Sequence, residues 1–236
     1  CMYARCDSRG MWQNTAHIIS QLQNIKSAVT WVPCHHDLGI MSALFMPLYL
    51  NIPSFLISPR DFITHPINWL NTVTLAPDCY SAAPNFAYEL CCKKITEQER
   101  QQLNLSLWRY AGCGAEKNQI STLQKFANTF SQCGFKPSSF SPAYGLAEHT
   151  VCVSGFTSNN NPINYAIPLT DIQLKNNDHQ LKQQCSLPHG KAFNEHRIII
   201  VDPSSLLPCP DDTVGEIWCQ GPSVALGYRN NNTLTQ

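Results

Sequence analysis

The sequence has few charged residues and no excess of either sign. Asp, Glu, Lys and Arg make up 14% of its 236 residues, well below the usual share of about a quarter, and 16 basic residues balance 16 acidic ones. We therefore expect no binding to nucleic acid or to anionic lipid. No apolar run approaches the roughly 18 to 20 residues of a membrane span, and the first residues lack a signal-peptide core. No transmembrane segment is expected.

The twelve cysteines contain no C-x-x-C pair, which argues against a structural zinc site and against a disulfide framework. Several lie inside apolar runs, namely Cys79, Cys91, Cys152 and Cys219. We expect these to be buried, reduced thiols that pack as small apolar side chains, and this favours a cytoplasmic protein.

Three widespread catalytic signatures are missing as well. The chain contains no G-x-x-x-x-G-K-[ST], no G-x-G-x-x-G and no G-x-S-x-G. The standard mononucleotide, dinucleotide and serine-hydrolase signatures are thus absent.

Apolar periodicity predicts helices that alternate with strands through the first two thirds of the chain, which indicates an α/β fold with a largely parallel sheet. Asp37 and Asn85 are positioned to cap two of the helices. The expected strands are 28–32, 54–58 (a buried strand) and 79–83, and the expected helices are 15–22, one from residue 38, one from about residue 66, one after residue 85, 97–103 and 121–133.

The composition and the apolar pattern of the sequence change after residue 153. Residues 155–164 and 174–189 are polar and rich in Asn and Gln, and strand patterns return at 197–201 and 216–219. We expect an α/β subdomain over residues 1–154, and a polar, insertion-like segment with a β-rich subdomain over residues 155–236.

Three short stretches carry residues suited to ligand chemistry. In Pro-Ala-Tyr-Gly-Leu-Ala-Glu (142–148), the ring of Tyr144 suits stacking on a planar base and the carboxylate of Glu148 suits Mg²⁺. A strand, a turn and a buried tyrosine explain the same residues equally well. In Ala-Gly-Cys-Gly-Ala-Glu (111–116), small residues allow close approach of the backbone to a ligand, as would a plain strand-to-helix turn.

Cys-His-His-Asp (34–37) forms a polar corner after a predicted strand. Adjacent residues on such a corner cannot all converge on one metal ion. The acyltransferase pattern His-His-x-x-x-Asp-Gly requires three intervening residues that are absent here. A ligand-facing corner at the carboxyl end of a strand remains open, beside a capping Asp with exposed histidines.

Taken together and in order, five stretches resemble the fatty acyl-AMP ligases of the adenylate-forming superfamily, which also includes acyl-CoA synthetases and peptide-synthetase adenylation domains. They are Trp-Val-Pro-Cys-His-His-Asp-Leu-Gly (31–39), Ala-Pro-Asn-Phe-Ala-Tyr-Glu-Leu-Cys (83–91), Gly-Ala-Glu (114–116), Pro-Ala-Tyr-Gly-Leu-Ala-Glu (142–148) and Gly-Glu-Ile-Trp (215–218). The segment 83–88 and the long interval between Glu148 and Val201 favour the acyl-AMP ligase branch over CoA ligases.

The resemblance implies an enzyme that uses ATP and Mg²⁺ to convert a fatty acid into acyl-AMP. The acyl group then passes to an acyl carrier protein, or to a polyketide or peptide synthase. It places His36 and Glu148 at the reacting groups, with Glu148 as the Mg²⁺ ligand. It assigns the adenylate-binding wall to Gly114, Ala115, Glu116, Tyr144, Gly145, Leu146 and Ala147.

Several family features do not occur in these 236 residues: the Ser/Thr/Gly-rich phosphate loop, the Gly-Asp-Leu ribose segment and the C-terminal lid domain with its catalytic Lys. Cys113, Lys117 and Arg229 stand where Asn, Pro and Trp are usual. We therefore expect an internal fragment of the large N-terminal domain, inactive or nearly so alone. Three alternatives remain: a degenerate module that binds acyl or adenylate groups, a long-chain fatty acyl-CoA synthetase, and a metal-dependent hydrolase using His35, His36 and Asp37.

Overall fold

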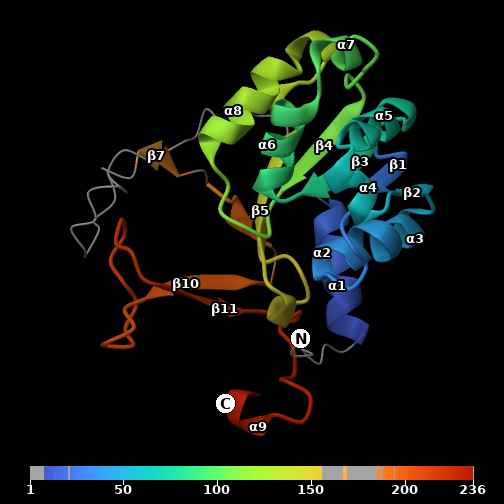
Figure 1. The fold of residues 1–236 in the computed structure, drawn as a ribbon. Helices are drawn as coiled ribbons and strands as arrows, with labels where there is room; N and C mark the ends of the chain where they lie inside the picture. Colours follow the sequence, from blue (N-terminus) through green and yellow to red (C-terminus); the bar gives the residue numbers. More distant parts are fainter. Residues whose placement is uncertain are drawn as a thin grey trace.

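A seven-stranded sheet organises the chain, in the order β2-β1-β3-β4-β5-β6-β9 (Figure 1). The computed structural model describes residues 8–20, 22–155, 167–168, 185–186, 188–193 and 195–235. The first five strands in this order are parallel, and β6 and β9 add antiparallel pairs. The predicted α/β fold with a largely parallel sheet is confirmed. The strands are β1 Ser27–Thr30, β2 Ser54–Leu56, β3 Cys79–Ala83, β4 Trp108–Cys113, β5 Phe140–Tyr144, β6 Ser154–Gly155 and β9 Lys191–Ala192.

Two further antiparallel pairs lie outside this sheet. They are β7 Ile167–Pro168 with β8 Cys185–Ser186, and β10 Arg197–Val201 with β11 Glu216–Gln220. The last pair confirms both strands predicted after residue 195. Most of the two predicted polar stretches, 155–164 and 174–189, falls outside the described residues. The division near residue 155 stays a prediction.

The helices cover the sheet and connect its strands. Among the described segments, no helix is long and apolar enough to cross a membrane. The α-helices are α1 Ser8–Ser20, α2 Asp37–Ile40, α3 Met46–Leu50, α4 Pro59–Thr64, α5 Ile67–Leu75, α6 Asn85–Lys94, α7 Glu97–Arg100, α8 Ile120–Thr129 and α9 Asn232–Thr235. A π-helical turn, η1 Met41–Phe45, joins α2 to α3, and the 3₁₀ turns are η2 Ser131–Cys133, η3 Pro137–Ser139 and η4 Ala147–His149.

An aromatic core fills the space between the sheet and helices α5, α6 and α8. Helices α6 and α8 lie side by side there (Figure 1). Trp69 and Trp108 meet edge to face with ring centroids 5.2 Å apart, and Tyr88 meets Phe126 in the same way at 5.1 Å. All four side chains are fully buried. Replacing one of these rings by Ala is expected to cost about 3 to 5 kcal/mol.

The two faces of the sheet carry different side chains, because successive residues of a strand point to opposite faces. Val29, Ala83 and Ala111 belong to the aromatic core. Tyr80, Ala82 and Gly112, at alternate positions, line a cavity instead. The sheet therefore supports a packed core on one face and an open space on the other.

Four local expectations were wrong. The strand β2 is not buried, because it is the outermost strand of the sheet, and Leu56 is 59% exposed. Asp37 is the first residue of α2, and His36 is the N-cap. Asn85 lies inside α6, and its Oδ1 accepts a hydrogen bond from the backbone N–H of Gln119 at 2.9 Å. Cys219 is only half-buried because it lies in the exposed strand pair β10–β11.

Candidate active site

A cavity of about 500 Å³ opens at the carboxyl ends of β3, β4 and β5, where ligands bind in open α/β sheets. Helix α1 supplies Ile18 to its wall, the segment just after α1 supplies Leu22, and η1 supplies Met41. These side chains and Phe193 are apolar, so that this part of the cavity suits an aliphatic or aromatic ligand group.

Small residues on adjacent strands keep the cavity open. Gly112 of β4 is paired in register with Ala82 of β3 and with Ser141 of β5, and all three line the cavity. A Cβ atom on Gly112 would lie 2.7 Å from the Cβ of Ala82. The absence of a side chain at Gly112 thus contributes directly to the space above the sheet.

The turn after β5 forms one wall. Tyr144, Gly145, Leu146 and Ala147 all line the cavity. A Cβ atom on Gly145 would lie only 1.7 Å from the backbone oxygen of Val151, which explains the glycine at this close approach. Burial is the main cause that raises the pKa of the Tyr144 phenol.

Two of the residues that follow β4 line the cavity, and the next residue contacts helix α6. Gly114 and Ala115 line the cavity, and Ala115 adopts the left-handed conformation with φ +64°. The side chain of Glu116 points elsewhere: Oε1 accepts a hydrogen bond from the backbone N–H of Phe86 at 2.6 Å. Its carboxylate therefore caps the first turn of α6, where a negative charge is favourable.

His36 and its neighbours His35 and Asp37 also line the cavity. Nδ1 of His36 lies 2.6 Å from Oδ1 of Asp37, and the same oxygen is 2.7 Å from the backbone N of Leu38. Nδ1 also lies 3.1 Å from this backbone N, which makes His36 the N-cap of α2. With a proton on Nε2, either as imidazolium or as the neutral ring, His36 can donate a hydrogen bond into the cavity.

Glu148 lies beside the cavity wall, next to Ala147. Oε1 of Glu148 accepts a hydrogen bond from the hydroxyl of Tyr228 at 2.6 Å, and its backbone oxygen accepts from the N–H of Ala225 at 2.6 Å. The carboxylate is not part of the cavity lining. This hydrogen bond raises the pKa of the Tyr228 phenol.

A buried polar cluster, formed by Asn14, His149, His196 and Ser223, was not predicted. Oγ of Ser223 lies 2.8 Å from Nδ1 of His149 and 2.7 Å from Nε2 of His196, and it accepts from Nδ2 of Asn14 at 3.1 Å. Burial lowers the pKa of His149. The residues come from α1, η4 and two loops, so that no local pattern in the sequence could reveal the cluster.

The site fits Mg²⁺ through a single protein carboxylate better than it fits a multi-ligand metal centre. In the part of the chain that the structure describes, no group of three His, Cys, Asp or Glu side chains could hold a metal ion. Mg²⁺ is commonly bound through one or two carboxylates together with substrate phosphates. Glu148 can supply such a ligand.

The comparisons with known proteins agree with this geometry. The AMP-binding enzyme family matches residues 7–229. Two similar proteins are the medium-chain-fatty-acid–[acyl-carrier-protein] ligases TtuA of Teredinibacter turnerae (34% identical, 88% of this chain and 33% of the relative) and JamA of Moorena producens (37% identical, 86% and 35%). A fatty acyl-adenylate ligase from L. pneumophila, solved with acyl adenylate and pyrophosphate, superposes with a TM-score of 0.86 at 32% identity, over 98% of this chain and 42% of that one.

The chain spans about a third of the length of these curated relatives. The family match covers most of the chain, and the similar solved structure is the kind of enzyme that the ordered motifs resemble. The chain belongs to the AMP-binding enzyme family, and its resemblance to the fatty acyl-AMP ligases is confirmed.

Proposed function

We propose that the protein activates a fatty acid as its adenylate. One oxygen of the fatty acid carboxylate attacks the α-phosphorus of ATP, the bond from that phosphorus to the bridging oxygen breaks, and pyrophosphate leaves. The thiol of a phosphopantetheine group then attacks the acyl carbon, and AMP leaves. The observation that carries the proposal is the cavity, which combines an apolar wall from α1 and Met41 with the ring and backbone of the 144–147 turn.

The adenylate would lie against the two loops that follow β4 and β5. The ring of Tyr144 stacks on adenine, and Gly145, Leu146 and Ala147 continue this wall. Gly114 and Ala115 allow the nucleotide to approach the backbone closely. Glu116 stabilises this wall without lining the cavity, because its carboxylate accepts a hydrogen bond from the N-terminus of α6 and so holds the loop in place.

The reacting groups would lie near His36 and Glu148. Adenylation develops negative charge on phosphate oxygens, and fixed polar groups that neutralise it lower the barrier. His36 lines the cavity and can hydrogen-bond there through Nε2. Glu148 would hold Mg²⁺, which neutralises charge on the phosphates when bound.

The acceptor of the acyl group is proposed to be an acyl carrier protein, alone or within a polyketide or peptide synthase. Support comes from the names of the two relatives, which are ligases for acyl carrier protein. A long-chain fatty acyl-CoA synthetase uses the same first step, and a transfer assay with each thiol separates the two. The 236-residue chain is proposed to be inactive or nearly so alone, since it contains no phosphate-binding loop of its own.

The test uses the protein expressed from the complete reading frame that contains this chain. We expect pyrophosphate release that requires both ATP and a medium- or long-chain fatty acid, and a loss of about 100-fold or more in Glu148→Ala. Glu89→Ala is the control, because Glu89 forms an ion pair with the exposed Lys93 on α6 and does not line the cavity. Absence of fatty-acid-dependent release, or a Glu148→Ala variant as active as wild type, would overturn the proposal.

A further inference from the structure

Residues 223–228 pack against the turn that carries Glu148. The hydroxyl of Thr150 donates to the backbone oxygen of Ser223 at 2.9 Å, and the N–H of Ala225 donates to the backbone oxygen of Glu148 at 2.6 Å. The hydroxyl of Tyr228 completes the set at Oε1 of Glu148. Both the backbone and the carboxylate of Glu148 are thus held by one segment about 80 residues further along the chain.

Local backbone geometry aims Tyr228 at this carboxylate. Gly227 adopts φ +138°, and a Cβ atom there would lie 2.2 Å from Cγ2 of Thr235. The backbone N–H of Tyr228 donates to Oγ1 of Thr235 at 3.0 Å. The tight turn and the hydrogen bond to α9 fix the backbone of Tyr228, and the hydrogen bond to Glu148 fixes its phenol hydroxyl.

We propose that Tyr228 is a positioning residue that holds Oε1 of Glu148 and thereby presents Oε2 to the divalent cation of the adenylation reaction. The inference rests on the proposed function. The O–H···O⁻ distance of 2.6 Å lies in the range of charge-assisted hydrogen bonds. Within the described residues, Oε2 has no hydrogen bond of its own. A carboxylate fixed at one oxygen loses less freedom when the other binds a cation, and loss of such supporting contacts typically costs about 10- to 100-fold in metal affinity.

The test measures binding of Mn²⁺, as a spectroscopic substitute for Mg²⁺, by electron paramagnetic resonance in the presence of α,β-methylene ATP, which cannot transfer its adenylyl group to the fatty acid. The protein is the one expressed from the complete reading frame. Tyr228→Phe removes only the hydroxyl and should weaken Mn²⁺ binding about tenfold or more. Tyr49→Phe removes the same atom from an exposed residue of α3 and should leave Mn²⁺ binding unchanged.

Two further readouts separate positioning from damage to the fold. The affinity of Tyr228→Phe for the nucleotide analogue without any divalent cation should equal that of wild type. In turnover, the Mg²⁺ concentration for half-maximal rate should rise while the rate at saturating Mg²⁺ stays near that of wild type. Unchanged Mn²⁺ binding in Tyr228→Phe overturns the inference, and so does a loss of nucleotide affinity without cation.

Glu148→Gln distinguishes this inference from the proposed function. If this variant binds Mn²⁺ as well as wild type does, Glu148 is not the cation ligand and the inference fails, whereas fatty-acid-dependent release of pyrophosphate tests the proposed function separately. If Glu148→Gln loses Mn²⁺ but Tyr228→Phe keeps it, the cation site stands and only the positioning role of Tyr228 is wrong.

Discussion

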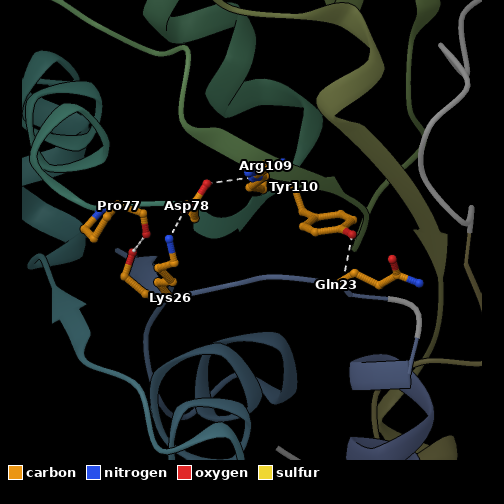
Figure 2. A network of polar contacts seen from close by, with 7 residues as sticks. Gln23, Lys26, Pro77, Asp78, Arg109 and Tyr110 are labelled. Carbon is orange, nitrogen blue, oxygen red and sulfur yellow. Dashed lines mark hydrogen bonds and ion pairs between the residues drawn. The ribbon is translucent and has the colours of Figure 1, made fainter.

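Nε of Arg109 lies 2.6 Å from Oδ1 of Asp78, a contact that joins β4 to the turn before β3 (Figure 2). Oδ2 of Asp78 accepts from Nζ of Lys26 at 2.7 Å, just before β1. Asp78 is only 6% exposed. One carboxylate therefore fastens three neighbouring strands at their amino ends, opposite to the cavity at their carboxyl ends.

Asp78→Asn should destabilise the fold in a pH-dependent way. Hydrogen bonds from Lys26 first, and then from Arg109, lower the pKa of Asp78 in the folded protein. The stabilisation is therefore complete above the unfolded pKa of about 3.9 and disappears as the pH falls through the lower folded pKa. At neutral pH we expect a loss of only about 1 to 2 kcal/mol in the free energy of unfolding, because both basic side chains are exposed and their charges are screened by water.

Urea unfolding at neutral and at acidic pH measures this difference. Asp211→Asn is a matched control in an exposed loop and should have little effect. A loss for Asp78→Asn that stayed constant down to the most acidic pH would contradict the assigned role of the carboxylate.

Glu116→Ala should lower stability by about 0.5 to 2 kcal/mol, because the first turn of α6 loses the acceptor for the N–H of Phe86. Glu116→Gln keeps an amide oxygen at this place and should recover most of the loss. Chemical unfolding of both variants provides the measurement. Equal stability of Glu116→Ala and wild type would show that the cap contributes nothing.

Cys113 and Cys152 should resist alkylation although both line the cavity. Burial raises the pKa of each thiol to about 12, so that the reactive thiolate is nearly absent near neutral pH. Cys34 is exposed and should react before Cys113 and Cys152. Mass mapping after brief treatment with iodoacetamide checks the order, and labelling of Cys113 as fast as Cys34 would refute it.

The regular elements could be predicted where the signal was local. The strand 79–83 matches β3 at both ends, and Gly134, with φ +82°, ends the helical segment after α8 as expected. The burial of β2 could not be predicted, because an apolar run does not reveal that its strand lies at the edge of the sheet. The N-cap of α2 is His36 and not the predicted Asp37. The side chains of both residues lie beside the N–H of Leu38, and the sequence alone does not distinguish between them.

The residues of the site, like the regular elements, could be predicted only where the signal was local. Tyr144 to Ala147 and Gly114 to Ala115 were predicted from two short stretches, and the fold brings both to one cavity. The contact of Glu116 with Phe86 spans 30 residues, and that of Tyr228 with Glu148 spans 80. Such partners depend on the tertiary arrangement, and periodicity carries no information about them.

The most direct test of the account is calorimetric titration of the protein from the complete reading frame with a non-hydrolysable acyl-adenylate analogue, comparing wild type with Tyr144→Ala. Stacking on a base is worth about 1 to 3 kcal/mol, so the variant should bind roughly 5- to 160-fold more weakly. Wild type should bind one analogue per chain, and the variant should show this weakening. No heat of binding to wild type, or equal affinity of the two proteins, would contradict an acyl-adenylate site at the cavity.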